Sequence, residues 1–242
     1  MQKARCSALV RLTDNDILFG HATFEEYKEM IRMFKYYDLP TGAAASKMMF
    51  SSYPGAISST DDYYILDSGL AVTETTLSMI TDSAFAALKD DPHTLPDYIR
   101  VLAANRNSKS AEEWMKSMHE TTTGLYSSQW SVVDYNKFTP GQSLQSGTFF
   151  VMEQIPGFSH YEDKTSHLEE HGYFGSYNVP MYDQARKASF FDVATREKGD
   201  RYSYESAPRA KMFRENARNV TSFNDMRNMM RFNRYSAAAS KG

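Results

Sequence analysis

The chain has 242 residues, of which 41% are hydrophobic and 24% are charged, and its formal net charge is −3. A chain of this length can bury a substantial core, as one large domain or two small ones. A slightly acidic chain without a cluster of Lys and Arg has no electrostatic footprint for nucleic acid, so we expect no nucleic-acid partner. No apolar run approaches the ~18 residues of a membrane-spanning helix, and we therefore expect no transmembrane segment.

The first part of the chain predicts a β-hairpin, because two apolar runs flank a turn cluster at residues 13–16. If the loop holds two or four residues, Ala8 lies opposite His21 and Cys6 lies opposite Thr23. Opposed residues share a face and side chains alternate with a period of two, so all four side chains point to one side. The thiol and the imidazole are then diagonal neighbours, roughly 7–8 Å apart. A three-residue loop would break this arrangement.

The rest of the chain mixes helical and strand patterns. Residues 24–37 have apolar side chains at three- and four-residue steps and Thr23 as a possible N-cap, which predicts an amphipathic helix. Further helices are expected at residues 83–89, 98–104, 110–119, 209–218 and 223–232, the third of them with a capping box. Strands are expected at residues 48–50, 61–69, 129–134 and 147–154.

Other segments have weaker patterns. Residues 70–76 fit a strand, or a helix that begins at about Thr73. Residues 157–175 are expected to be an irregular surface excursion, residues 193–199 a polar linker and residues 235–242 a disordered tail. The elements lack a regular βαβ rhythm, so periodicity alone indicates a mixed α and β protein.

Cys6 is the single cysteine of the chain, and its position near the amino terminus gives it an unusual chemical option. If the Arg5–Cys6 bond is cut, Cys6 carries both a thiol nucleophile and a free α-amine. An α-amine titrates near pH ~8 and can act as general base toward its own thiol. The alternative is an inert small side chain in the core, because free cysteine is among the most buried residue types.

Several motifs favour the first interpretation. In chain order they are Cys6-Ser-Ala-Leu-Val, Ser51-Ser-Tyr-Pro-Gly55, Tyr64-Ile-Leu-Asp-Ser-Gly69, Glu74-Thr-Thr76, Glu153-Gln-Ile-Pro156, Ser176-Tyr-Asn-Val-Pro180 and Ala207-Pro-Arg-Ala-Lys-Met-Phe-Arg214. Together they resemble the phospholipase B-like family of the N-terminal nucleophile (Ntn) hydrolase superfamily, over nearly the whole chain. The resemblance implies an α+β fold, a four-layer αββα sandwich of two antiparallel sheets between helix layers. It also implies one domain over residues 1–242, with residues 1–5 as the remnant of a propeptide.

The resemblance implies catalytic roles for two side chains far from Cys6. Asn178 is expected to donate an amide hydrogen to the oxyanion, and Arg209 is expected to orient the amino-terminal residue. An amide and a guanidinium are both suitable donors to developing negative charge. The alternatives are a turn residue before Val-Pro for Asn178, and a buried ion pair at a helix start for Arg209.

Three further residues are expected to bind substrate. His21 shares the predicted face with Cys6 and would orient the α-amine or contact the substrate; the alternative is a hydrogen-bonded core histidine. Thr76 resembles a family position near the pocket, although an ordinary sheet threonine fits equally well. Phe24 stands where family members carry Trp, which keeps an aromatic wall but removes the indole N–H donor.

The remaining histidines give no strong indication of a metal site. His167 and His171 have the i, i+4 spacing of a zinc-binding helix, but Gly172 follows and no HExxH motif is present. We therefore expect a solvated acidic loop, no metal and no cofactor. The absence of a Gly-Xaa-Ser-Xaa-Gly motif argues against a serine lipase.

These observations predict a cysteine Ntn hydrolase, matured at Arg5–Cys6, that hydrolyses an acyl bond in a phospholipid or an N-acyl amide. The second hypothesis is a catalytically silent lipid- or protein-binding member of the same fold. The third is a structural protein with an inert Cys6, which slow labelling by a thiol reagent would favour.

The ends of the sequence lead to an expectation about its origin. Residues 1–5 are too short for a signal peptide, and one cysteine permits no intramolecular disulfide. Family members carry a signal peptide and a long chain before the cysteine, and a cysteine-bearing segment after the last motif. We therefore expect a fragment, with the missing amino-terminal chain of the precursor as a partner. The resemblance implies a lysosomal or secreted protein, in which Asn219-Val-Thr221 would be a glycosylation sequon.

Overall fold

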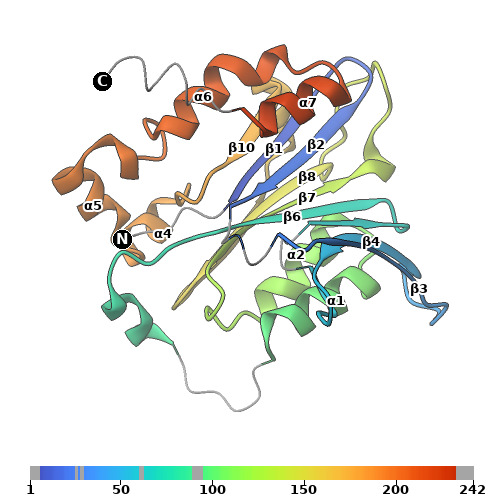
Figure 1. Ribbon diagram of the computed structural model, residues 1–242, viewed down its shortest axis with the longest axis horizontal. Coiled ribbons are helices and arrows are strands. Elements are labelled where there is room, and N and C mark those ends of the chain that lie inside the picture. The colour runs from blue at the N-terminus through green and yellow to red at the C-terminus, as the bar shows by residue number, and fades with distance from the viewer. Residues whose placement is uncertain (1–5, 25–26, 28–29, 60–62, 89–94, 233–242) are drawn as a thin grey trace.

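A computed structural model describes residues 6–24, 27, 30–59, 63–88 and 95–232. These residues form two antiparallel β-sheets that lie against each other, with helices on both outer faces (Figure 1). The four-layer αββα arrangement expected from the resemblance is confirmed. The predicted propeptide remnant, residues 1–5, and the predicted disordered tail, residues 235–242, lie outside the described residues.

The smaller sheet has the strand order β10-β1-β2. Its strands are β1 (Cys6–Leu12), β2 (Ile17–Thr23) and β10 (Tyr173–Ser176). Cys6 pairs with Thr23 and Ala8 pairs with His21, so the register predicted for the hairpin is confirmed. The turn is closed by the amide of Thr13, which donates to the carbonyl of Asp16 at 2.8 Å.

The larger sheet is a meander in which each strand pairs with the next along the chain. Its strands are β3 (Met33–Asp38), β4 (Lys47–Ser52), β5 (Tyr63–Leu66), β6 (Leu70–Thr76), β7 (Ser128–Asp134), β8 (Phe149–Ile155) and β9 (Phe158–Asp163). The ambiguous segment 70–76 is a strand, because it pairs along its whole length with β7. The other strands predicted between residues 48 and 154 are also present in the structure.

Helices lie at both outer faces. The α-helices are α1 (Asp97–Asn107), α2 (Ala111–Glu120), α3 (Thr165–His171), α4 (Asp183–Ala188), α5 (Phe191–Lys198), α6 (Pro208–Asn216) and α7 (Phe223–Met230). Short 3₁₀ turns occur at Asp82–Ala87, Tyr135–Lys137, Asp200–Tyr202 and Ala217–Asn219. The capping signature at Ser110 is confirmed, since its hydroxyl accepts from the amide of Glu113. None of the described helices combines the length and the apolar composition needed to cross a bilayer.

Three apolar clusters correspond to the three interfaces between the layers. Helices α1 and α2 cover the larger sheet through a cluster that includes Trp114 and Trp130, both fully buried. The two sheets meet through residues such as Val10 and Phe149. Helices α6 and α7 cover the smaller sheet through Phe213 and its neighbours.

The helix predicted over residues 24–37 is wrong for its second half, and residues 25–26 and 28–29 of its first half lie outside the described residues. Met33–Asp38 is instead the edge strand β3, which pairs with β4 from Met33 opposite Ser52 to Asp38 opposite Lys47. The aromatic residues of this segment suit a half-exposed strand as well as a helix. Pairing with β4, and the edge-on packing of Tyr37 against Phe50 with ring centroids 5.0 Å apart, favours the strand.

Two segments expected to be irregular are ordered. Residues 157–175 contain β9, α3 and β10, because β9 forms a hairpin with β8 and β10 pairs with β1. Residues 193–199 belong mostly to α5, which buries Phe191 and Ala194 and exposes its polar side. Residues 82–87 form a 3₁₀ helix where an α-helix had been expected. Of these segments, β10 is placed by a distant part of the chain, since its partner is β1.

Candidate active site

The structure brings the three predicted catalytic residues into one hydrogen-bonded group. Cys6 is the first residue of β1, Asn178 follows the end of β10, and Arg209 lies in the first turn of α6. The backbone amide of Cys6 donates to Oδ1 of Asn178 at 3.2 Å. Nη2 of Arg209 donates to the same oxygen at 2.8 Å. The amide oxygen of Asn178 therefore links the other two residues.

Arg209 also holds the backbone on the carboxyl side of the Cys6 Cα atom. Its Nη1 donates to the carbonyl oxygen of Cys6, and to Oγ of Ser7 at 3.0 Å. Both peptide groups that flank the Cα atom of Cys6 are thus fixed by side chains. This agrees with the orienting role that the resemblance implies for Arg209.

Burial lowers the pKa of Arg209 to about 10, and the nearby Cys6 thiol opposes that change. At neutral pH the guanidinium is still charged. Among the described residues Arg209 forms no ion pair with a carboxylate, so the predicted alternative of a buried ion pair is not observed there.

Asn178 occupies an unusual backbone position, with φ at 66°. Asn is one of the few residues with a side chain that adopts this left-handed conformation readily. Its Nδ2 donates to the backbone carbonyl of Thr76 on β6 at 2.7 Å. One amide hydrogen is thereby engaged, so a role in binding the oxyanion would use the second hydrogen on Nδ2. Oδ1 accepts from Cys6 N and from Nη2 of Arg209 and thus joins these two residues.

Thr76 and His21 connect the site to the larger sheet. Thr76 contributes its backbone carbonyl, while its hydroxyl lies 3.5 Å from Oε2 of Glu74. Nε2 of His21 lies 2.9 Å from the carbonyl oxygen of Glu74, and Nδ1 lies 3.5 Å from the hydroxyl of Thr23. A neutral imidazole protonated on Nε2 satisfies both contacts. His21 thus tethers β2 to β6 on the face that Cys6 also occupies.

Phe24 lies between two clefts at the open edge of β2. Its side chain is 47% exposed. The larger cleft, of about 720 Å³, includes His21, Thr23 and Phe24 in its lining. The smaller one, of about 370 Å³, includes Ser7, Phe24 and Arg209. Cys6 itself is 5% exposed, so the reactive position is buried beside these clefts.

A buried polar chain beneath the site was not identified from the sequence. The hydroxyl of Thr75 bonds to that of Ser176 at 2.6 Å, and Ser176 donates to the amide oxygen of Gln129. Nε2 of Gln129 donates to Glu153 at 2.6 Å. Glu153 belongs to the motif Glu153-Gln-Ile-Pro156, and a carboxylate within the apolar strand pattern of residues 147–154 is the sequence feature that indicates a structural role.

Glu153 anchors the segment that carries Asn178. Its carboxylate accepts from the backbone amides of Met181 and Tyr182, which follow the Ser176–Pro180 motif. Burial raises the pKa of Glu153 to about 7, although these amides and Gln129 oppose the change. The loop between β10 and α4 is therefore held from below by a carboxylate that titrates near neutrality.

His160, His167 and His171 line neither of the two clefts beside Cys6. His160 on β9 bonds to Glu162, while the rings of His167 and His171 stack on α3 with centroids 4.2 Å apart. Within the described part of the chain no group of three or more His, Cys, Asp or Glu side chains is close enough to hold a metal ion. The histidines predicted to lie in a loop are thus on a strand and a helix.

The chain is similar to known proteins over its whole length. A family model described as Phospholipase B matches residues 1–242. Phospholipase B-like protein A of Dictyostelium discoideum is 35% identical over 237 residues, which cover 95% of this chain and 41% of that protein. Phospholipase B-like 1 of Homo sapiens is 36% identical over 235 residues, covering 95% and 42%. The chain thus spans about two fifths of the length of these relatives.

Two solved structures have a weaker likeness to the fold. A mutant of conjugated bile acid hydrolase from Clostridium perfringens is 15% identical, with a TM-score of 0.46 over 81% of this chain and 58% of that one. Penicillin V acylase from Agrobacterium tumefaciens is 12% identical, with a TM-score of 0.45 over 94% and 63%. Values this low support no inference about activity. The match to the family model and the identity to its members do establish the family: this chain belongs to the phospholipase B family.

Proposed function

We propose that this chain carries the catalytic centre of a cysteine Ntn hydrolase that cleaves an acyl bond in a phospholipid or an N-acyl amide. The observation that carries the proposal is the contact of Cys6 N with Asn178 Oδ1 at 3.2 Å, inside a group completed by Arg209. After cleavage of the preceding bond, the same nitrogen would be an α-amine. Asn178 would then hold that amine beside the thiol it must activate.

Maturation would begin with attack of Cys6 Sγ on the carbonyl carbon of Arg5. The Arg5–Cys6 C–N bond breaks as the new C–S bond forms, and the departing nitrogen takes up the thiol proton. Water then hydrolyses the thioester, which releases the Arg5 carboxylate and regenerates the thiol. Arg209 keeps the carbonyl of Cys6 in place throughout, so the new amino terminus stays bound.

Turnover would use the same groups. The thiol proton passes to the α-amine, Sγ bonds to the acyl carbon of the substrate, and the negative charge develops on its carbonyl oxygen. The α-ammonium protonates the leaving alcohol or amine as the scissile bond breaks. Water then attacks the acyl-enzyme, and the products are a carboxylic acid and the free thiol. The second hydrogen of Asn178 Nδ2 would donate to the oxyanion.

The larger cleft at the edge of β2 supports a lipid-like substrate. Its lining includes Phe19, Tyr63 and Met226, which suit an acyl chain. Arg227 and Arg231 also line it, and a guanidinium is well suited to a phosphate group. Its volume of about 720 Å³ lies within the ordinary range for small-molecule sites. Phe24 would form part of the wall, and His21 would lie at the end nearest Cys6.

A catalytically silent binding member of the same fold is the second candidate. The burial of Cys6, at 5% exposure, favours it, because an acyl carbonyl must reach Sγ for the reaction to occur. In that case the cleft would bind a lipid or a protein segment without turnover. Since relatives are more than twice as long as this chain, we propose that segments outside it, among them the amino-terminal chain of the precursor, help to form the complete site. By analogy with the family, we propose a lysosomal or secreted location.

The test is the intact mass and amino-terminal sequence of the full-length protein after incubation at mildly acidic pH. Cys6→Ala is the null variant, and Cys6→Ser keeps a weaker nucleophile of similar size. A new terminus at Cys6 in the wild type, slower cleavage in Cys6→Ser and none in Cys6→Ala would support the proposal. Equal cleavage in all three would show that another protease acts, and an intact wild type would favour the silent binding protein.

A further inference from the structure

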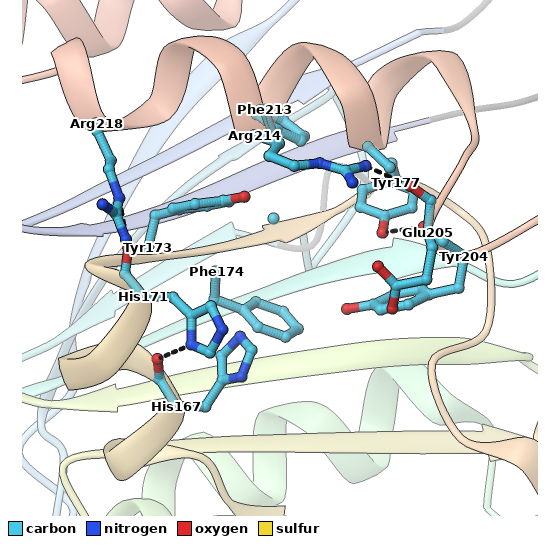
Figure 2. A pocket seen from close by; sticks show the side chains of 12 residues that line it. His167, His171, Tyr173, Phe174, Tyr177, Tyr204, Glu205, Phe213, Arg214 and Arg218 are labelled. Atoms are coloured by element: carbon cyan, nitrogen blue, oxygen red, sulfur yellow. Dashed lines mark hydrogen bonds between the residues drawn. The ribbon is translucent and has the colours of Figure 1, made fainter.

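A third cavity, separate from the two clefts at β2, is lined by residues of α3, β10 and α6. It has a volume of about 550 Å³. Figure 2 shows its polar side chains approaching from separate elements: two histidines from α3, Tyr173 from β10, two arginines from α6 and the following turn, and Glu205 from the segment before α6. Cys6, Asn178 and Arg209 are not among its lining residues, so the cavity is separate from the candidate active site, although Tyr177, Phe213 and Arg214 belong to the same sequence motifs as Asn178 and Arg209.

The arginines of this cavity have unused hydrogen-bonding capacity. Nη2 of Arg214 donates to the backbone carbonyl of Glu205, and Nε of Arg218 donates to that of His171 at 3.2 Å. Each bond holds the guanidinium in place through a neutral partner. Within the described residues neither arginine forms an ion pair with a carboxylate. Because a guanidinium has five N–H donors, each arginine keeps several for a ligand.

The surroundings add positive charge. Arg11 donates to the backbone carbonyl oxygen of Arg218 at 3.1 Å, so a third guanidinium contacts the backbone of Arg218. Burial lowers the pKa of His167, and the neighbouring His171 and Lys164 lower it further, while Glu170 and Glu205 oppose the change. Of the lining side chains, Arg214 and Arg218 are cationic and Glu205 is anionic, in a chain whose net charge is −3. The cavity is thus a locally positive site on an acidic protein.

The floor of the cavity is apolar and rigid. Phe174 and Phe213 are 2% and 1% exposed, and both contribute to the lining. Gly175 allows the ring of Phe213 to approach the strand, since a Cβ atom there would lie 2.7 Å from Phe213 Cδ2. One wall is formed by Tyr177 and Tyr204, whose rings stack with centroids 5.4 Å apart. A wholly ionic ligand would leave this surface unused.

We propose that this cavity binds an organic anion, with its carboxylate or phosphate group on Arg214 and Arg218 and its apolar body against the part-exposed rings of Tyr173 and Tyr204, above the buried floor of Phe174 and Phe213. In Figure 2 the side chain of Tyr173 lies between Arg218 and Arg214, with its hydroxyl on the side of Arg214, where it can donate to an oxyanion on that arginine. An oxyacid bound by two guanidinium groups and an aromatic floor is a common form of small-ligand recognition. The site is independent of catalysis at Cys6.

Isothermal titration of the full-length protein with octyl phosphate, octanoate and inorganic phosphate tests the proposal. The octyl probes share an apolar body and differ in their head group, and inorganic phosphate has the head group alone. We expect at least one octyl probe to bind at least tenfold more tightly than inorganic phosphate, and its preference identifies the class of head group. Equal binding of all three probes would refute the role of the apolar floor, and binding by none would refute the site.

Variants assign the binding to this cavity. Arg214→Gln combined with Arg218→Gln should weaken the octyl probe at least tenfold, whereas Lys211→Gln removes a charge from the same helix outside the cavity and should change nothing. The double variant Arg227→Gln and Arg231→Gln alters the cleft at β2 and should leave the binding of the octyl probe to this cavity unchanged. Tyr173→Phe keeps the ring and should weaken binding about threefold or more. The proposal would be overturned if the octyl probe no longer bound to the Arg227/Arg231 double variant, or if it still bound normally to the Arg214/Arg218 double variant.

Discussion

Replacement of Glu153 by Gln tests the carboxylate beneath the candidate site. Burial raises the pKa of Glu153 from its ordinary value of 4.5 to about 7. The folded protein therefore binds this proton more tightly than the unfolded chain does. Its contribution to stability is fully present below pH 4.5 and is lost as the pH rises through 7. At about 1.4 kcal/mol per tenfold change in proton affinity, the whole loss is on the order of 3 kcal/mol.

The assay is urea unfolding of wild type and Glu153→Gln at several values between pH 5 and 7.5. In the wild type, roughly 2 kcal/mol of the free energy of unfolding should be lost between pH 5 and 7.5. The variant cannot ionise at this position and should not show this loss. At pH 5 we expect the variant to be less stable than the wild type by about 1–3 kcal/mol, because the N–H donors of the new side-chain amide would face the N–H donor of Tyr182. Glu112→Gln, on the exposed side of α2, is the matched control. The same pH dependence in wild type and Glu153→Gln would refute the reasoning.

Three other substitutions test the site and the core. Asn178→Gly and Asn178→Ala both remove the amide side chain, but φ at this position is 66°, which glycine adopts without strain and alanine does not. Urea unfolding should therefore show the alanine variant to be about 1 kcal/mol less stable than the glycine variant. Equal stabilities would contradict the strain argument. Arg209→Lys should slow the appearance of the Cys6 terminus about tenfold or more, since Lys lacks the fork that reaches Cys6 O and Asn178 Oδ1; an unchanged rate by mass spectrometry would remove Arg209 from maturation. Trp114→Ala should lower the free energy of unfolding by about 3–5 kcal/mol, because the side chain is fully buried and bonds to Asn105; a loss below about 1 kcal/mol would show that the α2 interface is not part of the cooperative core.

The parts of the site that follow from the sequence are those within one hairpin. The turn cluster at residues 13–16 and the two-residue period of the strands place Cys6 on the same face as His21 if the loop holds two or four residues, and the observed register meets this condition. Asn178 and Arg209 are 172 and 203 residues from Cys6. No local rule connects positions so far apart, and only the family resemblance identified them before the structure placed them together.

The site also contains contacts that residue type alone does not reveal. Asn178 was expected to act through its amide hydrogens, but the observed contacts with Cys6 and Arg209 use its oxygen. The sequence assigns no role to Glu153, whereas the structure shows that its carboxylate accepts from the backbone amides of Met181 and Tyr182. The direction of a side chain and its burial depend on the packing of several strands, which a single sequence pattern does not encode.

By itself, the sequence determined the hairpin register, the capped start of α2 at Ser110 and most of the strands, since these depend on neighbours within a few residues. Tertiary structure decided the conformation of those segments whose hydrophobic pattern fits both a helix and a strand, or fits neither. Residues 33–38 became a strand through pairing with β4, and residues 173–176 became a strand through pairing with β1. The physical reason is that a buried or paired backbone must satisfy its hydrogen bonds. Where a partner strand supplies these bonds, the pairing outweighs the weak conformational preference of the local sequence.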